Sequence, residues 1–74
     1  MTPARKRFLR AVVRLTKKQG FPPTIRELCD ALGYRSTNAA AEMREKLAQS
    51  GHLTFRGFGA RTLRLTEAGQ AVLS

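Results

Sequence analysis

The chain is short of the residues that build disulfides, metal sites and membrane spans. Its single cysteine, Cys29, cannot form an internal disulfide, and one histidine with one cysteine cannot complete a structural zinc site. No apolar run approaches the roughly 20 residues that span a bilayer, and no uninterrupted apolar segment follows the basic N-terminus as in a signal peptide. We therefore expect a cytoplasmic protein that holds no metal or cofactor and does not associate with a membrane.

Acidic residues are also scarce. Asp and Glu number 5 against 14 Lys and Arg, which leaves a formal net charge of +9 on 74 residues. Such an excess favours polyanionic partners, most commonly nucleic acid, with an anionic membrane surface or an acidic protein as alternatives. The sequence also lacks a Ser-His-Asp set, a phosphate loop and paired carboxylates in a plausible cleft. We expect one domain over residues 1–74 that is not an enzyme.

The first helical pattern runs from about residue 3 to 18, between a Thr2-Pro3 start and a Gly20 stop. Its apolar side consists of Phe8, Leu9, Val12, Leu15 and Thr16. Its opposite side is basic, and no acid precedes Glu27. This side carries Arg7, Arg10, Arg14, Lys17 and Lys18. Two interpretations stay open for it: an ordinary solvated face, or an extra contact with an anionic surface through Arg7, Arg10, Arg14 and Lys17.

Two further helices follow a break at Pro22-Pro23. Thr24-Ile25-Arg26-Glu27 is a capping box, which predicts a second helix over about 25–32. A short turn containing Gly33 comes next, and Ser36 caps a third helix over about 37–50. Two helices joined by a short turn with glycine indicate a helix-turn-helix.

After the third helix the apolar period changes from helical to two. Alternation over 52–56 and 61–66 predicts two strands, with a glycine-rich tip at 57–60 between them. The strand residues expected to cover the helices are Leu53, Phe55, Leu63 and Leu65. A last short helical segment begins after Thr66. The fold predicted is therefore α+β and mainly α, a winged helix-turn-helix of three helices, a two-stranded hairpin wing and a short C-terminal helix.

The C-terminal segment ends in an apolar pair, Val72 and Leu73. Gly69 weakens this helix by roughly 1 kcal/mol relative to Ala, so the segment needs packing against the domain or a second copy. We expect Val72 and Leu73 to be exposed and to offer the seam of a homodimer, which could read two half-sites.

Several of these residues together resemble the DNA-binding domain of the LexA repressor family. The resemblance rests on the stretch from Gly20 to Leu28, on Leu32-Gly33-Tyr34-Arg35-Ser36, on Asn38-Ala39-Ala40 and on residues 47–51, and covers about residues 2–65. It implies a winged helix-turn-helix transcriptional regulator of repressor type that binds double-stranded DNA. Family repressors carry a second, self-cleaving domain, so we expect a stand-alone relative of phage or plasmid type, bacterial or phage-encoded and nucleoid-associated.

The resemblance also implies that the helix over 37–50 enters the major groove. Asn38 suits adenine and Glu42 suits cytosine N4, although turn chemistry and ordinary surface acids are the alternatives. Ala41 and Thr37 depart from the usual acid and proline of the family, so we expect a site different from the standard operator. The predicted base-reading residues are Ser36, Asn38, Ala39, Ala41, Glu42 and Glu45.

The wing over 56–61 is expected on the DNA backbone or in the minor groove, with Phe58 either packed under it or against a sugar. The predicted backbone and wing contacts are Arg26, Arg35, Thr37, Arg56, Gly57, Phe58 and Arg61. An alternative function is a protein-interaction winged helix that binds an acidic partner such as a polymerase, a replication protein or another repressor. A third is nucleic-acid binding by shape alone.

Overall fold

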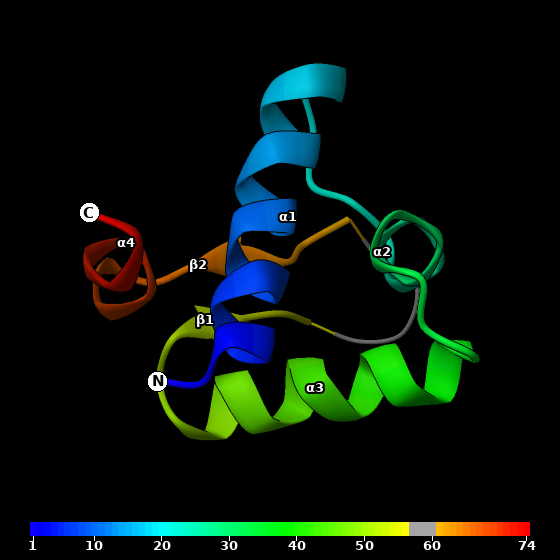
Figure 1. Cartoon of the computed structure of the whole chain (residues 1–74). Helices are drawn as coiled ribbons and strands as arrows, with labels where there is room; N and C mark the ends of the chain where they lie inside the picture. The colour runs from blue at the N-terminus through cyan, green and yellow to red at the C-terminus, as the bar shows by residue number, and fades with distance from the viewer. Residues whose placement is uncertain (57–60) are drawn as a thin grey trace.

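Helices make up most of the chain, and a short β-hairpin joins the last two of them (Figure 1). The computed structural model describes residues 1–56 and 61–74, which form four helices and two strands. Their bounds are Pro3–Gln19 (α1), Ile25–Leu32 (α2), Thr37–Gln49 (α3), Leu53–Thr54 (β1), Arg64–Leu65 (β2) and Glu67–Leu73 (α4). This is the predicted winged helix-turn-helix. Among these described residues, no helix combines the length and the apolarity needed to cross a membrane.

The helices begin at the hydroxyl-bearing residues that the sequence indicates. The four caps are Thr2, Thr24, Ser36 and Thr66, and each side-chain oxygen accepts a hydrogen bond from the backbone N–H three residues later, at 3.1–3.2 Å. These bonds satisfy N–H groups that have no partner within the helix. At the other end, α1 and α2 stop at Gly20 and Gly33, whose φ angles of 86° and 73° lie in the left-handed region that glycine adopts without strain.

α1 crosses the middle of the molecule, with α2 and α4 on opposite sides of it and the hairpin behind it in the view of Figure 1. α3 lies across the N-terminal end of α1. The elements share one apolar core, built from Phe8, Leu9, Ala11, Val12, Leu28, Leu47, Leu53 and Leu63. Phe8, Leu9 and Val12 of the predicted apolar side of α1 lie in this core, and Ala11 joins them without having been predicted.

The hairpin is shorter than the sequence predicts, with two residues in each strand. β1 and β2 are antiparallel, and Leu53 lies opposite Leu65. Thr54 lies opposite Arg64, and beyond this second pair a side chain takes the place of the backbone hydrogen bonds. The Arg56 N–H donates to Thr62 Oγ1 at 2.8 Å, and the Thr62 hydroxyl donates back to the Arg56 carbonyl oxygen at 3.2 Å. Gly57 and Phe58 of the predicted wing tip lie outside the described residues.

α4 packs on the domain itself, so the predicted exposed seam at its end is wrong. Val72 and Leu73 are half-buried and pack against the core. The physical reason lies in Gly69, which is buried where α4 meets the start of the hairpin. A Cβ at Gly69 would overlap the carbonyl oxygen of His52. The glycine that weakens the helix in isolation therefore permits α4 to dock and cover its apolar side.

Candidate nucleic-acid interface

α3 has one face in the core and one face in solvent. Ala40 and Leu47 are fully buried and fix its orientation. Asn38, Glu42 and Glu45 are exposed on the other side. They lie on adjacent turns of the helix, because residues three and four apart share a face. The sequence thus predicted the exposed side of α3 at these three positions. Ala39 and Ala41, also among the predicted base-reading residues, are half-buried.

The turn between α2 and α3 is held from inside the domain. The Tyr34 N–H donates to the Cys29 carbonyl oxygen at 3.1 Å, and the Cys29 thiol donates to the Tyr34 carbonyl oxygen at 3.4 Å. The Tyr34 ring lies 6.5 Å from the Phe8 ring, centroid to centroid, and burial raises the pKa of its hydroxyl. Cys29 is therefore a buried structural thiol. This packing leaves Arg35 exposed immediately before the N-terminus of α3.

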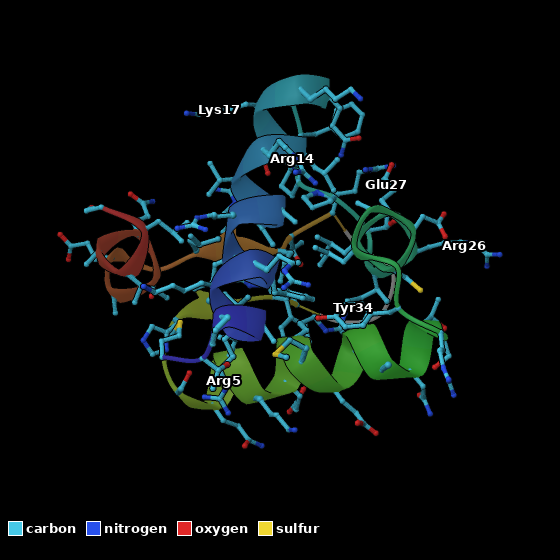
Figure 2. All side chains as sticks on the ribbon, viewed as in Figure 1. Arg5, Arg14, Lys17, Arg26, Glu27 and Tyr34 are labelled. Atoms are coloured by element: carbon cyan, nitrogen blue, oxygen red, sulfur yellow. The ribbon has the colours of Figure 1, made fainter. Side chains whose placement is uncertain are left out.

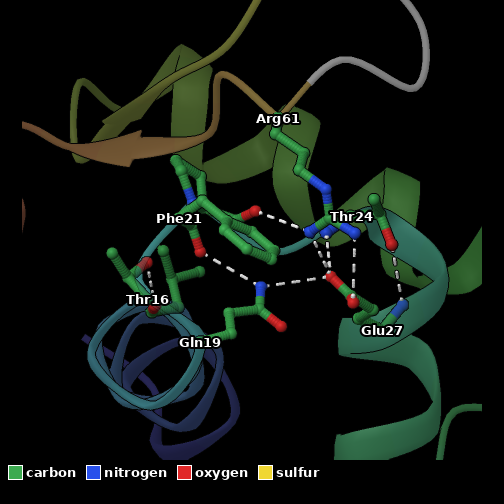
Figure 3. A network of polar contacts seen from close by, with 8 residues as sticks. Thr16, Gln19, Phe21, Thr24, Glu27 and Arg61 are labelled. Atoms are coloured by element: carbon green, nitrogen blue, oxygen red, sulfur yellow. Dashed lines mark hydrogen bonds and ion pairs between the residues drawn. The ribbon is translucent and has the colours of Figure 1, made fainter.

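The hairpin is tied to the start of α2 through Arg61 and Glu27 (Figure 3). Arg61 Nη1 lies 2.8 Å from Glu27 Oε1, and Nη2 lies 3.3 Å from Oε2. Arg61 Nη1 also donates to the Pro22 carbonyl oxygen at 3.0 Å, and the guanidinium carbon lies 4.4 Å from the centroid of the Phe21 ring. We call this pair and its partners the Glu27 network. Arg61, predicted to touch DNA, is here engaged within the protein.

Glu27 accepts more than one hydrogen bond in this network. Besides Arg61, its Oε1 accepts from the Thr24 N–H at 2.9 Å and from Gln19 Nε2 at 3.3 Å (Figure 3). The Arg61 hydrogen bonds, followed by the Thr24 N–H, lower the pKa of Glu27 to about 2. The capping box was predicted from four consecutive residues. The ion pair was not, because its partners are 34 residues apart.

A second arginine ties the hairpin to α3. The guanidinium carbon of Arg44 lies 4.0 Å from the centroid of the Phe55 ring. Cations attract the face of an aromatic ring, and here the contact also covers half-buried Phe55. This role of Arg44 was not predicted. The helical spacing offered a signal, since Arg44 lies one and three residues from the inward-facing Met43 and Leu47.

The outer face of the hairpin is basic. A hollow of about 570 Å³ is lined by Thr54, Phe55, Arg56, Arg61, Thr62 and Arg64. Arg56 and Arg64 are exposed there. Arg64 was not predicted, although the alternation of Leu63, Arg64 and Leu65 indicates that it faces away from the core. The hairpin therefore offers a concave cationic surface beside its predicted tip.

The basic side of α1 lies apart from the exposed side of α3. We call its residues the basic stripe; they are Arg7, Arg10, Arg14, Lys17 and Lys18, and all are exposed. Figure 2 labels Arg14 and Lys17 on the half of α1 that is farther from α3. In the same view Arg26 extends outward from α2, on the side where α3 begins. Arg35 thus directly precedes α3 and Arg26 is exposed on α2, whereas Arg14 and Lys17 lie toward the far end of α1.

The chain is similar throughout most of its length to LexA sequences. The model of the LexA DNA binding domain family matches residues 1–62. The LexA repressor of Halorhodospira halophila is 37% identical over 68 residues, which are 92% of this chain and 30% of that protein. The LexA repressor of Bordetella petrii is 40% identical over 62 residues, which are 82% of this chain. The LexA repressor of Cellvibrio japonicus is 32% identical over 72 residues, which are 97% of this chain. The chain spans 28–36% of the length of these relatives.

Proposed function

Because this chain belongs to the LexA DNA-binding domain family, we propose that it binds double-stranded DNA at a specific base sequence and represses transcription. The observation that carries the proposal is the free outer face of α3, which presents Asn38, Glu42 and Glu45 from a helix anchored by buried Ala40 and Leu47. A helix held in this way fits the major groove, where its N-terminal residues meet base edges. An effect on transcription follows from occupation of a site near a promoter.

The residues at the start of α3 have the chemistry to read bases. The Asn38 amide can pair with adenine N6 and N7, and the Glu42 carboxylate can accept from cytosine N4. Acids repel phosphate, so two exposed acids on a DNA-facing helix of such a basic chain favour a reading role over a backbone role. The Ala41 methyl suits thymine or close approach, although the residue is half-buried. Ser36, Ala39 and Glu45 complete the proposed reading surface.

Backbone contacts would set the orientation of the domain. Arg26 is exposed at the start of α2, and Arg35 is exposed directly before α3, where the N-terminal N–H groups also favour phosphate. Thr37 and Arg56 are exposed and keep their proposed backbone roles. The proposed contacts of Gly57 and Phe58 with DNA also stand, although these two residues lie outside the described part of the chain. For Arg61, contact with phosphate would compete with the Glu27 network, so we propose that it chiefly orients the hairpin.

Selection of binding sites from a random duplex library at roughly physiological salt tests the proposal, since screening limits purely electrostatic binding. We expect one consensus. Asn38→Ala should lose selectivity at one base pair, by about 1–3 kcal/mol, because a bidentate contact is removed. Gln49→Ala, at the exposed far end of α3, is the matched control and should keep the consensus. Recovery of no consensus, with binding that vanishes as salt rises, would contradict specific reading.

The symmetry of that consensus also tests the proposed homodimer. A two-fold symmetric site with half-sites about 10 base pairs apart requires two copies related by a two-fold axis. Because Val72 and Leu73 pack inward, this apolar pair is not free to form the contact of such a dimer. A single asymmetric site would indicate a monomer on DNA.

A further inference from the structure

The basic stripe on α1 is a charged surface that the proposed contact between α3 and DNA does not use. α1 contains no acidic residue, and the first acid of the chain is Glu27. Within residues 1–56 and 61–74, the ion pair found joins Glu27 to Arg61, and none of the five stripe residues lies within ion-pair distance of a carboxylate. One helix therefore carries five exposed cations with no carboxylate at ion-pair distance in the described part of the chain.

The stripe is also rigidly held. The opposite side of α1 carries Phe8, Leu9 and Val12, which are at most 2% exposed. From Arg7 to Lys18 the helix rises about 16 Å, so the five charges are spaced at about one per helical turn or closer. A fixed row of cations costs less side-chain and backbone entropy on binding than a flexible basic tail of equal charge. Such a row matches an anion that is itself extended and regularly charged.

We infer that the basic stripe binds a second duplex DNA segment, separate from the one read by α3, so that one domain bridges two duplexes. Duplex DNA carries one phosphate charge per about 1.7 Å of its axis, which supplies several phosphates along the length of the stripe. α1 stands across α3 and its C-terminal end lies on the far side of the molecule (Figure 1). A duplex seated on α3 therefore does not run along the stripe.

The composition of the stripe favours DNA over an acidic protein. Stable protein interfaces are centred on buried aromatic or aliphatic anchors. In the described part of the chain the exposed large apolar side chains are Met1 and Phe21, and neither belongs to the stripe. Phe21 moreover lies against the Arg61 guanidinium. Cations without apolar anchors suit phosphates, whose binding is driven by charge and counterion release.

A capture experiment tests this inference. A duplex carrying the selected consensus is immobilised, the full chain is bound to it, and a labelled duplex without the consensus is added. We expect the chain to retain the labelled duplex, and Arg10→Gln/Arg14→Gln to retain at least about tenfold less. For this second duplex the slope of log affinity against log salt should fall by about 2 in the variant, since two phosphate contacts are lost.

The matched control changes net charge by the same amount elsewhere. Ala68→Glu/Ala71→Glu adds two acids at exposed positions of α4, outside both proposed DNA surfaces. It should capture the second duplex within about twofold of the unmodified chain. If both double variants lose capture of the second duplex equally, the effect is one of net charge and the inference is wrong. The inference is also wrong if Arg10→Gln/Arg14→Gln still captures the second duplex, because bridging would then come from dimers or from α3.

The inference goes beyond the proposed function and can fail separately from it. If selection yields no consensus, an arbitrary duplex is immobilised and the same comparison of variants applies. If the chain holds its consensus duplex and captures no second duplex, the inference is wrong and specific reading stands. In that case, poly-glutamate binding that is lost in Arg10→Gln/Arg14→Gln would identify an acidic protein as the partner of the stripe.

Discussion

Glu27 joins three parts of the molecule through one carboxylate. Its oxygens accept hydrogen bonds from the N-cap of α2, from Gln19 at the end of α1 and from Arg61 of the hairpin. The first contact follows from a local motif. The third contact depends on how the folded chain brings Arg61 to Glu27, and the residues next to Glu27 in the sequence give no sign of it. The capping hydrogen bonds of Glu27 were therefore predictable, whereas its long-range ion pair was not.

The lowered pKa of Glu27 predicts how stability varies with pH. Because the folded-state pKa is about 2 against an ordinary value of 4.5, its stabilising contribution is present above about pH 4.5 and is lost as pH falls toward 2. Urea midpoints measured between pH 6 and 2.5 should therefore fall less steeply for Glu27→Gln than for the unmodified chain. Glu45→Gln, on the exposed side of α3, should leave the steepness unchanged. Equal slopes in all three proteins would contradict this role.

Ser36 combines a structural role and a proposed DNA-facing role. Its Oγ accepts the Ala39 N–H at 3.2 Å and it precedes the first turn of α3. Ser36→Ala should lower the free energy of unfolding by about 1 kcal/mol, because a capping oxygen is removed. Ser36→Asp keeps a capping oxygen but brings a negative charge to the proposed phosphate contact. We expect the Asp variant to keep its thermal midpoint and to lose at least about tenfold in DNA affinity. Unchanged DNA affinity in Ser36→Asp would remove Ser36 from the interface.

At the scale of elements, the four helices were predictable because their signals are local. Each combines a hydroxyl cap, an apolar side at helical spacing and, for α1 and α2, a glycine stop. The strands were predicted too long, because alternation continues past Thr54 while Thr62 takes over the hydrogen bonding of Arg56. The direction in which Val72 and Leu73 face was also not predictable. Two adjacent apolar residues indicate that they are buried. They do not indicate whether they pack against this domain or against another protein chain.

α4 docks through the absence of a side chain at Gly69. Gly69→Ala should destabilise the domain by about 1–3 kcal/mol, because the added methyl overlaps the His52 carbonyl oxygen. Helix propensity alone predicts the opposite sign, since Ala favours a helix over Gly by about 1 kcal/mol. Gln70→Ala, one residue on and exposed, is the control and should change stability by less than about 0.5 kcal/mol. The free energies of unfolding of the two variants, measured with denaturant, show whether close docking of α4 or the helix propensity of residue 69 dominates. A stabilised Gly69→Ala would show that α4 does not dock closely.

At the scale of the whole molecule, charge is distributed unevenly around a small core. Cations occur on the outer hairpin face, around the start of α3 and along the basic stripe, while Glu42 and Glu45 lie on the proposed reading face. The composition predicted a polyanionic partner. It could not predict that the cations form separate surfaces, because their separation depends on how the helices cross. The base-reading and backbone residues remain predictions about a complex with DNA.

Affinity for the consensus should depend on salt through the cations near α3. With three phosphates contacted, by Arg26, Arg35 and Arg56, affinity should fall roughly 40-fold between about 50 and 200 mM salt. Arg35→Gln should reduce the slope of log affinity against log salt by about 1. Gln70→Glu lowers the net charge equally at an exposed position of α4 and should leave the slope unchanged. A slope that responds equally to both changes would indicate a diffuse electrostatic effect instead of a direct contact.

The Glu27 network has an evolutionary consequence. Losing Arg61 leaves a carboxylate that still accepts the Thr24 N–H, whereas losing Glu27 leaves that N–H without its acceptor and leaves a guanidinium beside Phe21 and the Pro22 carbonyl with no counter-charge. Substitutions at positions 61 and 27 should therefore be tolerated only when Arg61 is replaced before Glu27. In descendants of such a sequence, position 61 can drift first while an acid persists at position 27, and a neutral residue at 27 should become fixed only after the arginine has gone.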